Sequence, residues 1–91
     1  MDAQSTERTE AAGTTRVELE LPRQVETTVR LLDASGRSRA LIFQGAPQAG
    51  RHTFTFSGRD ADGHLLPGGV YFVEAKTASG ESRTERLVLV R

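Results

Sequence analysis

The alternation of apolar and polar residues is the feature that most constrains the fold of this chain. In "TTRVELELP", Val17, Leu19 and Leu21 alternate with charged residues. A period of two is typical of a strand with one buried face. Short apolar segments of similar character follow in "VETTVRLL", "SRALIFQG", "RHTFTFSG", "GVYFVEAKT" and "ESRTERLVLVR". After Gly13 there is no apolar stripe at the 3.6-residue helical period, so the pattern predicts an all-β domain.

Turn-forming residues separate these segments at regular intervals. Asp33-Ala34-Ser35-Gly36, the stretch "GAPQAG", the stretch 57–69 and "ASG" each carry the glycine, proline or short polar residues that favour turns. Short strands with turns at regular spacing are typical of a two-sheet sandwich. The sequence therefore predicts an antiparallel β-sandwich of six to seven strands.

The chain divides into a short first segment and one domain. Its 91 residues suffice for a single core, which we place at residues 14–91. Residues 1–13, "MDAQSTERTEAAG", hold no aliphatic side chain larger than Ala apart from Met1. Such a segment buries too little surface to offset its ordering entropy. We expect a flexible tail or linker, with a short helix over 6–12 as the alternative.

Composition argues against several functions. Twelve basic and twelve acidic residues cancel, whereas nucleic-acid binding needs a basic surplus. There is no cysteine, hence neither a disulfide nor a thiolate zinc site. No apolar run approaches the ~20 residues of a membrane-spanning helix, and the first residues lack the basic-then-apolar order of a signal peptide. We expect no nucleic-acid partner, no membrane insertion and no export signal within this chain.

The stretch "SGRDADGHLLPGGVYF", residues 57–72, holds the candidate chemistry. Asp60 and Asp62 precede Gly63, as in a calcium loop, but no glutamate follows at the position that would complete the coordination. In the alternative interpretation the aspartates accept local backbone hydrogen bonds and Gly63 takes a positive φ. We favour the turn and keep a calcium loop at Asp60 and Asp62 as the alternative.

Other catalytic or metal constellations are weaker. His52 and His64 are the two histidines, and no third ligand is implied beside them. No serine has a nucleophile-elbow sequence around it, and a sandwich of this size seldom has the cleft that a pair of glycosidase carboxylates flanks. We expect no enzyme activity and no cofactor.

Sheet edges are the remaining candidate for binding. Arg83, Glu85 and Arg86 lie in the last predicted strand. Charged side chains at an edge either recognise an added partner strand or prevent edge-to-edge pairing. The sequence leaves both interpretations open.

Five groups of residues follow one another along the chain in a recognisable order. They are Leu32-Asp33 with Gly36-Arg37; Ala49-Gly50 with His52; Gly58-Arg59-Asp60 with Gly63; Leu66-Pro67 with Gly69-Val70-Tyr71-Phe72; and the strand Arg86 to Arg91. In this order they resemble the Ig-like domain at the C-terminal end of flagellar hook-capping proteins, and the resemblance covers roughly residues 15–91. Similar modules end many exported bacterial proteins, including cargo of the type IX secretion pathway.

The resemblance implies an Ig-like or fibronectin type III-like sandwich. Its core and turn signature would be Gly36, Phe54, Phe56, Gly63, Pro67, Gly69 and Tyr71. Gly36, Gly50, Gly63 and Gly69 would sit in hairpin turns, and the Tyr71 ring would anchor the core while its hydroxyl finds a partner. One departure is that the family often has Trp just before the Gly-Arg-Asp-like turn, where this chain has Phe56 followed by Ser57.

The same resemblance implies a role without catalysis. We expect a C-terminal module of an exported multidomain bacterial protein, extracellular or at the cell surface, that serves in secretion sorting or surface attachment and binds a protein partner. An Ig-like scaffold part of a hook cap, binding hook subunits, is the first alternative. A carbohydrate-binding module, using Phe43 or Phe72, is the second. The isolated domain is expected to be a monomer.

Overall fold

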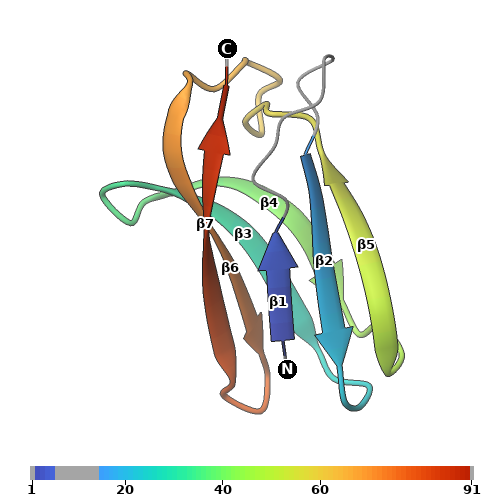
Figure 1. The fold of residues 1–91 in the computed structure, drawn as a ribbon. Helices are drawn as coiled ribbons and strands as arrows, with labels where there is room; N and C mark the ends of the chain where they lie inside the picture. Colours follow the sequence, from blue (N-terminus) through green and yellow to red (C-terminus); the bar gives the residue numbers. More distant parts are fainter. Residues whose placement is uncertain (1, 6–14, 91) are drawn as a thin grey trace.

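Two antiparallel sheets pack face to face in the computed structural model, which describes residues 2–5 and 15–90. The strands are β1 (Asp2–Ser5), β2 (Thr15–Leu21), β3 (Thr27–Asp33), β4 (Ser38–Gly45), β5 (Gly50–Phe56), β6 (Gly69–Thr77) and β7 (Ser82–Leu89). One sheet has the order β1-β2-β5 and the other the order β4-β3-β6-β7 (Figure 1). The predicted all-β, Ig-like sandwich is confirmed.

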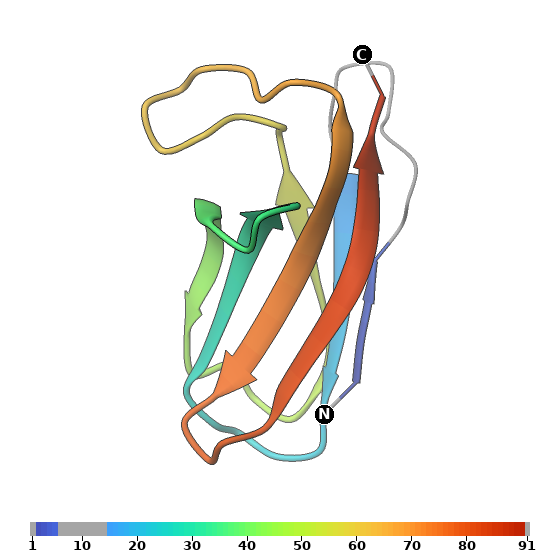
Figure 2. The same ribbon diagram turned by 90° about the vertical axis from the view of Figure 1, so that its left-hand side faces the viewer.

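The sequence alternation decides which side chains face the core. In β2 the burial alternates along Thr15–Leu21, with Val17, Leu19 and Leu21 almost fully covered. Figure 2, turned by 90°, shows the layer of β3, β4, β6 and β7 in front of β2. The two inner faces supply most of the buried apolar side chains, which are Val17, Leu19, Leu21, Val29, Leu31, Ala40, Phe56, Leu66, Tyr71, Val73, Ala75, Leu87 and Leu89. Each large one contributes about 1.5–3 kcal/mol on burial.

Strand β1 differs from the flexible tail that the sequence predicts for residues 1–13. Residues 2–5 form a strand that pairs antiparallel with β2, from Asp2 opposite Glu20 to Ser5 opposite Val17. A strand can join a sheet through its backbone amides and carbonyls alone, so the lack of large apolar side chains does not prevent the pairing. Residues 6–14, with the alternative helix over 6–12, lie outside the described residues.

The connection between β4 and β5 passes from one sheet to the other. The resemblance implied that Gly50 lies in a hairpin turn. Gly50 is instead the first residue of β5. Gly69 likewise begins β6, after the long connection 57–68. Within residues 2–5 and 15–90 there is also no helix long and apolar enough to cross a bilayer.

Candidate functional site

The connection 57–68, between β5 and β6, contains the residues that most resemble a site. It folds back on itself as a small hairpin in which Arg59 and Leu65 form an isolated β-bridge. The amide of Leu66 donates a hydrogen bond to the carbonyl of Gly58 at 2.8 Å. The Leu66 side chain is 1% exposed and belongs to the core, whereas Leu65 beside it is 56% exposed. One buried leucine therefore fixes this loop to the sandwich.

Asp60 closes the turn at the tip of this small hairpin. Its amide donates to the carbonyl of His64 at 2.9 Å, and the amide of Gly63 donates to the carbonyl of Asp60 at 3.0 Å. The carboxylate oxygen Oδ1 of Asp60 accepts the amides of Asp62 and His64, both at 2.9 Å. Gly63 has φ of +85°, a conformation that glycine adopts at little cost. This is a three-residue hairpin loop with glycine in the left-handed position.

The same five-residue turn occurs twice more. Its sequences are Asp33-Ala34-Ser35-Gly36-Arg37, Asp60-Ala61-Asp62-Gly63-His64 and Thr77-Ala78-Ser79-Gly80-Glu81. In each, the first and fifth residues are joined by a backbone hydrogen bond and the fourth residue, a glycine, donates to the first. The side chain of the first residue also accepts the amide of the fifth in every case, through Asp33, Asp60 or Thr77. The three glycines have φ between +85° and +94°.

Asp60, Asp62 and His64 are the one group of described side chains with a spacing that could suit a metal ion. One potential ligand atom from each lies within 4.8 Å of the others. Asp62 and His64 are exposed, and Oδ1 of Asp60 already accepts two backbone amides. In the turn at 33–37, Asp33 makes equivalent bonds although arginine replaces the histidine. We interpret the Asp60 carboxylate as part of the turn and retain the calcium loop only as the alternative to be tested.

Hydrogen bonding lowers the pKa of both turn carboxylates, Asp33 and Asp60. The amide of His64 is the largest cause that lowers the pKa of Asp60 below its usual value. The hydroxyl of Ser35, which donates to Oδ1 of Asp33 at 2.6 Å, is the largest cause that lowers the pKa of Asp33 to about 2. Arg39 contributes to both shifts, and its guanidinium lies 3.5 Å from the carboxylate of Asp33. Both groups are thus ionised at neutral pH.

Tyr71, near the start of β6, anchors the other end of the connection. Its ring is 5% exposed, and its hydroxyl donates to the carbonyl of Pro67 at 2.6 Å. A tyrosine at the start of this strand, bonded to the backbone a few residues upstream, is the tyrosine corner of Ig-like sandwiches. Pro67 itself is exposed and contributes its carbonyl.

The aromatic side chains of the signature differ in burial. Phe56 is 5% exposed in the core. Phe54 is half-buried and stacks on Phe43 of β4, with ring centroids 4.6 Å apart and planes at 29°. Phe43 is therefore engaged in packing, which removes it from the platform that a carbohydrate-binding module would need. His52 stands beside Phe54 and bonds the carbonyl of Gln48 through Nε2 at 2.6 Å, away from His64.

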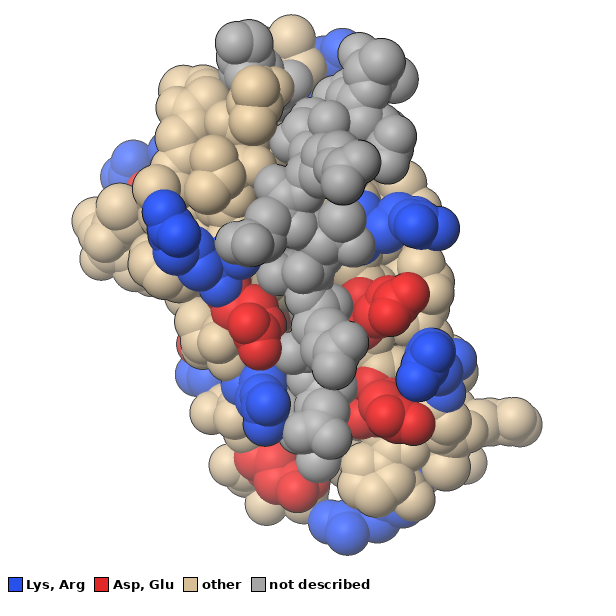
Figure 3. All heavy atoms as spheres, viewed as in Figure 1, with Lys and Arg blue, Asp and Glu red and all other residues tan. Residues whose placement is uncertain are grey.

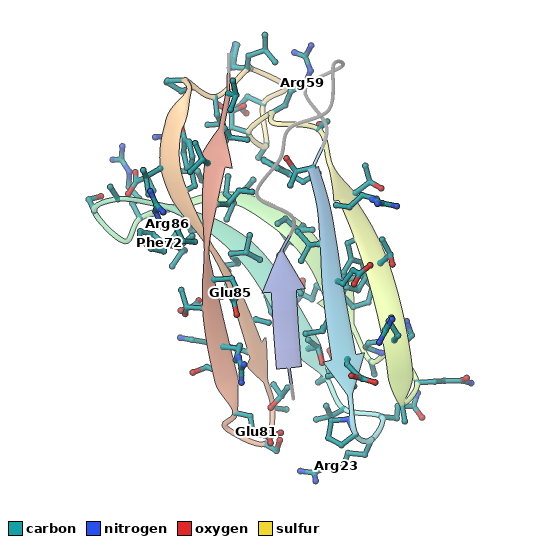
Figure 4. The ribbon with its side chains drawn as sticks, viewed as in Figure 1. Arg23, Arg59, Phe72, Glu81, Glu85 and Arg86 are labelled. Carbon is teal, nitrogen blue, oxygen red and sulfur yellow. The ribbon has the colours of Figure 1, made fainter. Side chains whose placement is uncertain are left out.

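Arg83, Glu85 and Arg86 all lie on β7, the last strand of the four-stranded sheet. Arg83 and Glu85 are 3.9 Å apart in a loose ion pair. Arg86 pairs across the sheet with Phe72 of β6, and Figure 4 shows the two side chains close together. Strand β7 lies beside β1 of the other sheet. On the face shown in Figure 3, the described acidic and basic side chains are interspersed, an arrangement that gives no single-sign field to attract a nucleic acid.

Three of these features were not predicted from the sequence. The repetition of the turn could have been read from the shared Ala-(Ser/Asp)-Gly core. The sequence does not reveal which of the adjacent leucines, Leu65 or Leu66, is buried, because the two residues are identical. The stacking of Phe43 on Phe54 joins strands of different sheets, and such contacts do not follow from alternation.

The two sheets, their strand order and the tyrosine corner define an Ig-like β-sandwich domain. The model of the FlgD Ig-like domain family matches residues 4–81, and the chain belongs to this family. A search of curated proteins gives no match.

Solved structures agree with this assignment. FlgD from P. aeruginosa is 25% identical with a TM-score of 0.69, over 96% of this chain and 72% of that one. FlgD from Xanthomonas campestris, described as capping the hook in flagellar assembly, is 19% identical with a TM-score of 0.66, over 96% and 62%. PorZ, a surface component of the type IX secretion system of Porphyromonas gingivalis, shares the fold at 24% identity and a TM-score of 0.51, over 82% and 9%.

Proposed function

We propose that this domain is a non-catalytic module of an exported multidomain bacterial protein, which docks on another protein during secretion sorting or surface attachment. The observation that carries the proposal is that the Asp60 carboxylate accepts hydrogen bonds within its own turn. The carboxylate in the most site-like loop bonds two backbone amides of its own turn. This carboxylate therefore stabilises the turn, and we expect the outer surfaces and strand edges to bind the partner.

The family and one structural neighbour support a role in export or at the surface. FlgD Ig-like domains and PorZ share this sandwich. Because the chain spans 9% of PorZ, the likeness is that of one module within a much larger protein. A small sandwich that is joined to other domains can serve as a recognition handle without chemistry of its own.

The test is to fuse the full 91-residue chain, with strand β1 included, to the C-terminus of a reporter enzyme in a bacterium that has a type IX pathway. The proposal predicts reporter activity on the cell surface, above that of a control reporter fused to an unrelated Ig-like sandwich. The Tyr71→Phe variant, in which the fold is retained, should behave like the parent. Equal surface activity for the module and the unrelated sandwich would contradict this function.

A scaffold role in a hook cap is the second candidate. It is favoured by FlgD from P. aeruginosa, which matches 96% of this chain at 25% identity. The experiment replaces the Ig-like region of a FlgD protein by the full 91-residue chain and counts assembled hooks. Restored hooks together with no surface reporter would favour the cap, and the reverse would favour the sorting module.

A further inference from the structure

Strand β5 presents a regular free edge. It ends the three-stranded sheet and pairs only with β2 among the described strands. All seven pairs, from Thr15 opposite Phe56 to Leu21 opposite Gly50, follow without a register shift. By contrast, the pairing of edge strand β4 with β3 shifts twice, and β7 lies along β1, whereas β5 approaches β4 of the other sheet at fewer positions. Figure 1 shows β5 at the margin of the molecule, with no described strand beyond it.

The side chains of β5 give little of the usual protection against pairing. Edge strands are normally blunted by proline, a bulge or charged side chains, and β5 has one permanently charged residue and neither a proline nor a register shift. Here Arg51, Thr53 and Thr55 are exposed on the outer face, and His52, Phe54 and Phe56 lie on the inner face. Threonine and phenylalanine favour strands. The one permanently charged residue, Arg51, lies near the end of the strand and is paired with Glu20 of β2.

The inner face beside this edge is incompletely covered. Phe54 and His52 are half-buried, although both point toward the other sheet. Phe54 rests on Phe43 across the gap between β5 and β4. A strand added to β5 would place side chains over this aromatic seam and remove more of it from water, which is a favourable change.

We propose that β5 pairs antiparallel with β5 of a second copy of this chain, and that residue 53 lies on the twofold axis. Residue 53 is the middle of Gly50–Phe56, so this register pairs all seven residues. It sets Thr53 opposite Thr53 of the second copy, Arg51 opposite Thr55 of the second copy, and His52 opposite Phe54 of the second copy. No like charges face each other, and threonine pairs and aromatic pairs are favourable cross-strand neighbours.

The result is a continuous six-stranded sheet with closed twofold symmetry. Both halves of the contact come from the same strand, β5, so the second copy alone can pair with the free backbone groups of this edge. The sequence analysis instead expects a monomer, because the sequence does not reveal which strand ends the sheet. This inference does not depend on the proposed role in sorting or hook capping.

The test is sedimentation velocity of the full 91-residue chain over a wide range of concentrations. We expect a concentration-dependent dimer. Thr53→Lys should weaken self-association by at least about tenfold, because like charges set opposite each other across an interface are strongly unfavourable. The new lysine faces Glu18 of β2, so the monomer fold is retained. Thr84→Lys, an exposed position on β7, is the matched control and should leave the dimer intact.

A mixture of Thr53→Lys and Thr53→Glu identifies the register. If residue 53 faces residue 53, the mixture should form a heterodimer at concentrations where each variant alone associates more weakly than the parent chain. Circular dichroism melting first establishes that both variants are folded, since Thr53→Glu lies opposite Glu18. A parent chain that stays monomeric at every concentration, a dimer insensitive to Thr53→Lys, or no association in the mixture would each overturn the proposal.

Discussion

The hydroxyl of Tyr71 donates a hydrogen bond to the carbonyl of Pro67, 2.6 Å away and four residues upstream. The ring of the same residue is buried between the two sheets. One side chain thereby joins the core to the end of the connection 57–68, which carries the Asp60 turn. A core residue thus helps to fix the position of the candidate site.

Removing this hydrogen bond should weaken the fold modestly, and removing the ring should weaken it severely. We expect Tyr71→Phe to lower the free energy of unfolding by about 1 kcal/mol, because one partly buried hydrogen bond is lost. Tyr71→Ala also leaves a cavity, and we expect a loss of about 3 kcal/mol. Chemical denaturation of both variants checks the order. Equal stability of Tyr71→Phe and the parent would show that the contact with Pro67 contributes nothing.

The adjacent leucines of the connection should respond differently to truncation. Leu66→Ala should cost about 3 kcal/mol, since a fully buried side chain leaves a cavity in the core. Leu65→Ala, 56% exposed, is the matched control and should change stability by less than about 0.5 kcal/mol. Thermal melting gives both values. A larger loss for Leu65→Ala would mean that the loop is anchored by the other leucine.

Thr15 contains a buried polar atom without a partner in the described part of the chain. Its Oγ1 is inaccessible and makes no hydrogen bond there. Replacing this hydroxyl by a methyl group of similar shape removes the cost of leaving it unpaired, so Thr15→Val should stabilise the domain by about 1 kcal/mol. Thr84→Val, at an exposed position, serves as the control. Destabilisation by Thr15→Val in urea unfolding would contradict this account.

Acid should unfold the domain partly through Asp33. The pKa of Asp33 is lowered from 3.8 to about 2, chiefly by the hydroxyl of Ser35. The unfolded chain therefore takes up the proton first as the pH falls, and the stability contributed by Asp33 is complete above its unfolded pKa. This contribution is lost as the pH falls from about 4 toward about 2.

Asp33→Asn keeps an oxygen that can accept the amides and has no charge to titrate. Unfolding free energies measured across this pH range should fall less steeply for Asp33→Asn than for the parent. The lowered pKa of Asp60 acts in the same direction, so some dependence on pH remains in the variant. Identical slopes for the two proteins would show that Asp33 is not involved.

Much of the fold could be predicted because one face of each sheet is buried. Alternation in Thr15–Leu21 identifies its inward residues directly, since successive side chains of a strand point to opposite faces. The turns were recognisable because Gly36 and Gly63 supply the positive φ that few other residues tolerate. These are local properties of the chain, and a single sequence contains them.

The remainder depends on contacts between distant residues. Strand β1 joins β2 through backbone groups, which leave no mark in the identity of Asp2–Ser5. The sequence analysis kept Phe43 as a candidate for carbohydrate binding, but its ring stacks on Phe54 of the opposite sheet. The order of the strands within each sheet leaves β5 with a free edge, and the packing of the two sheets places β7 beside β1. The alternation in the sequence contains no information on that strand order.

The central claim is that Asp60, Asp62 and His64 form a hairpin turn and not a metal site. The most direct measurement is a calcium titration, repeated with zinc, that follows backbone amide NMR shifts with and without a chelator. The account predicts that the amides of residues 60–64 move no more than those of the equivalent turn at 33–37. Saturable shifts confined to Asp60, Asp62 and His64 and reversed by the chelator would contradict it, and would make this loop a metal-binding site.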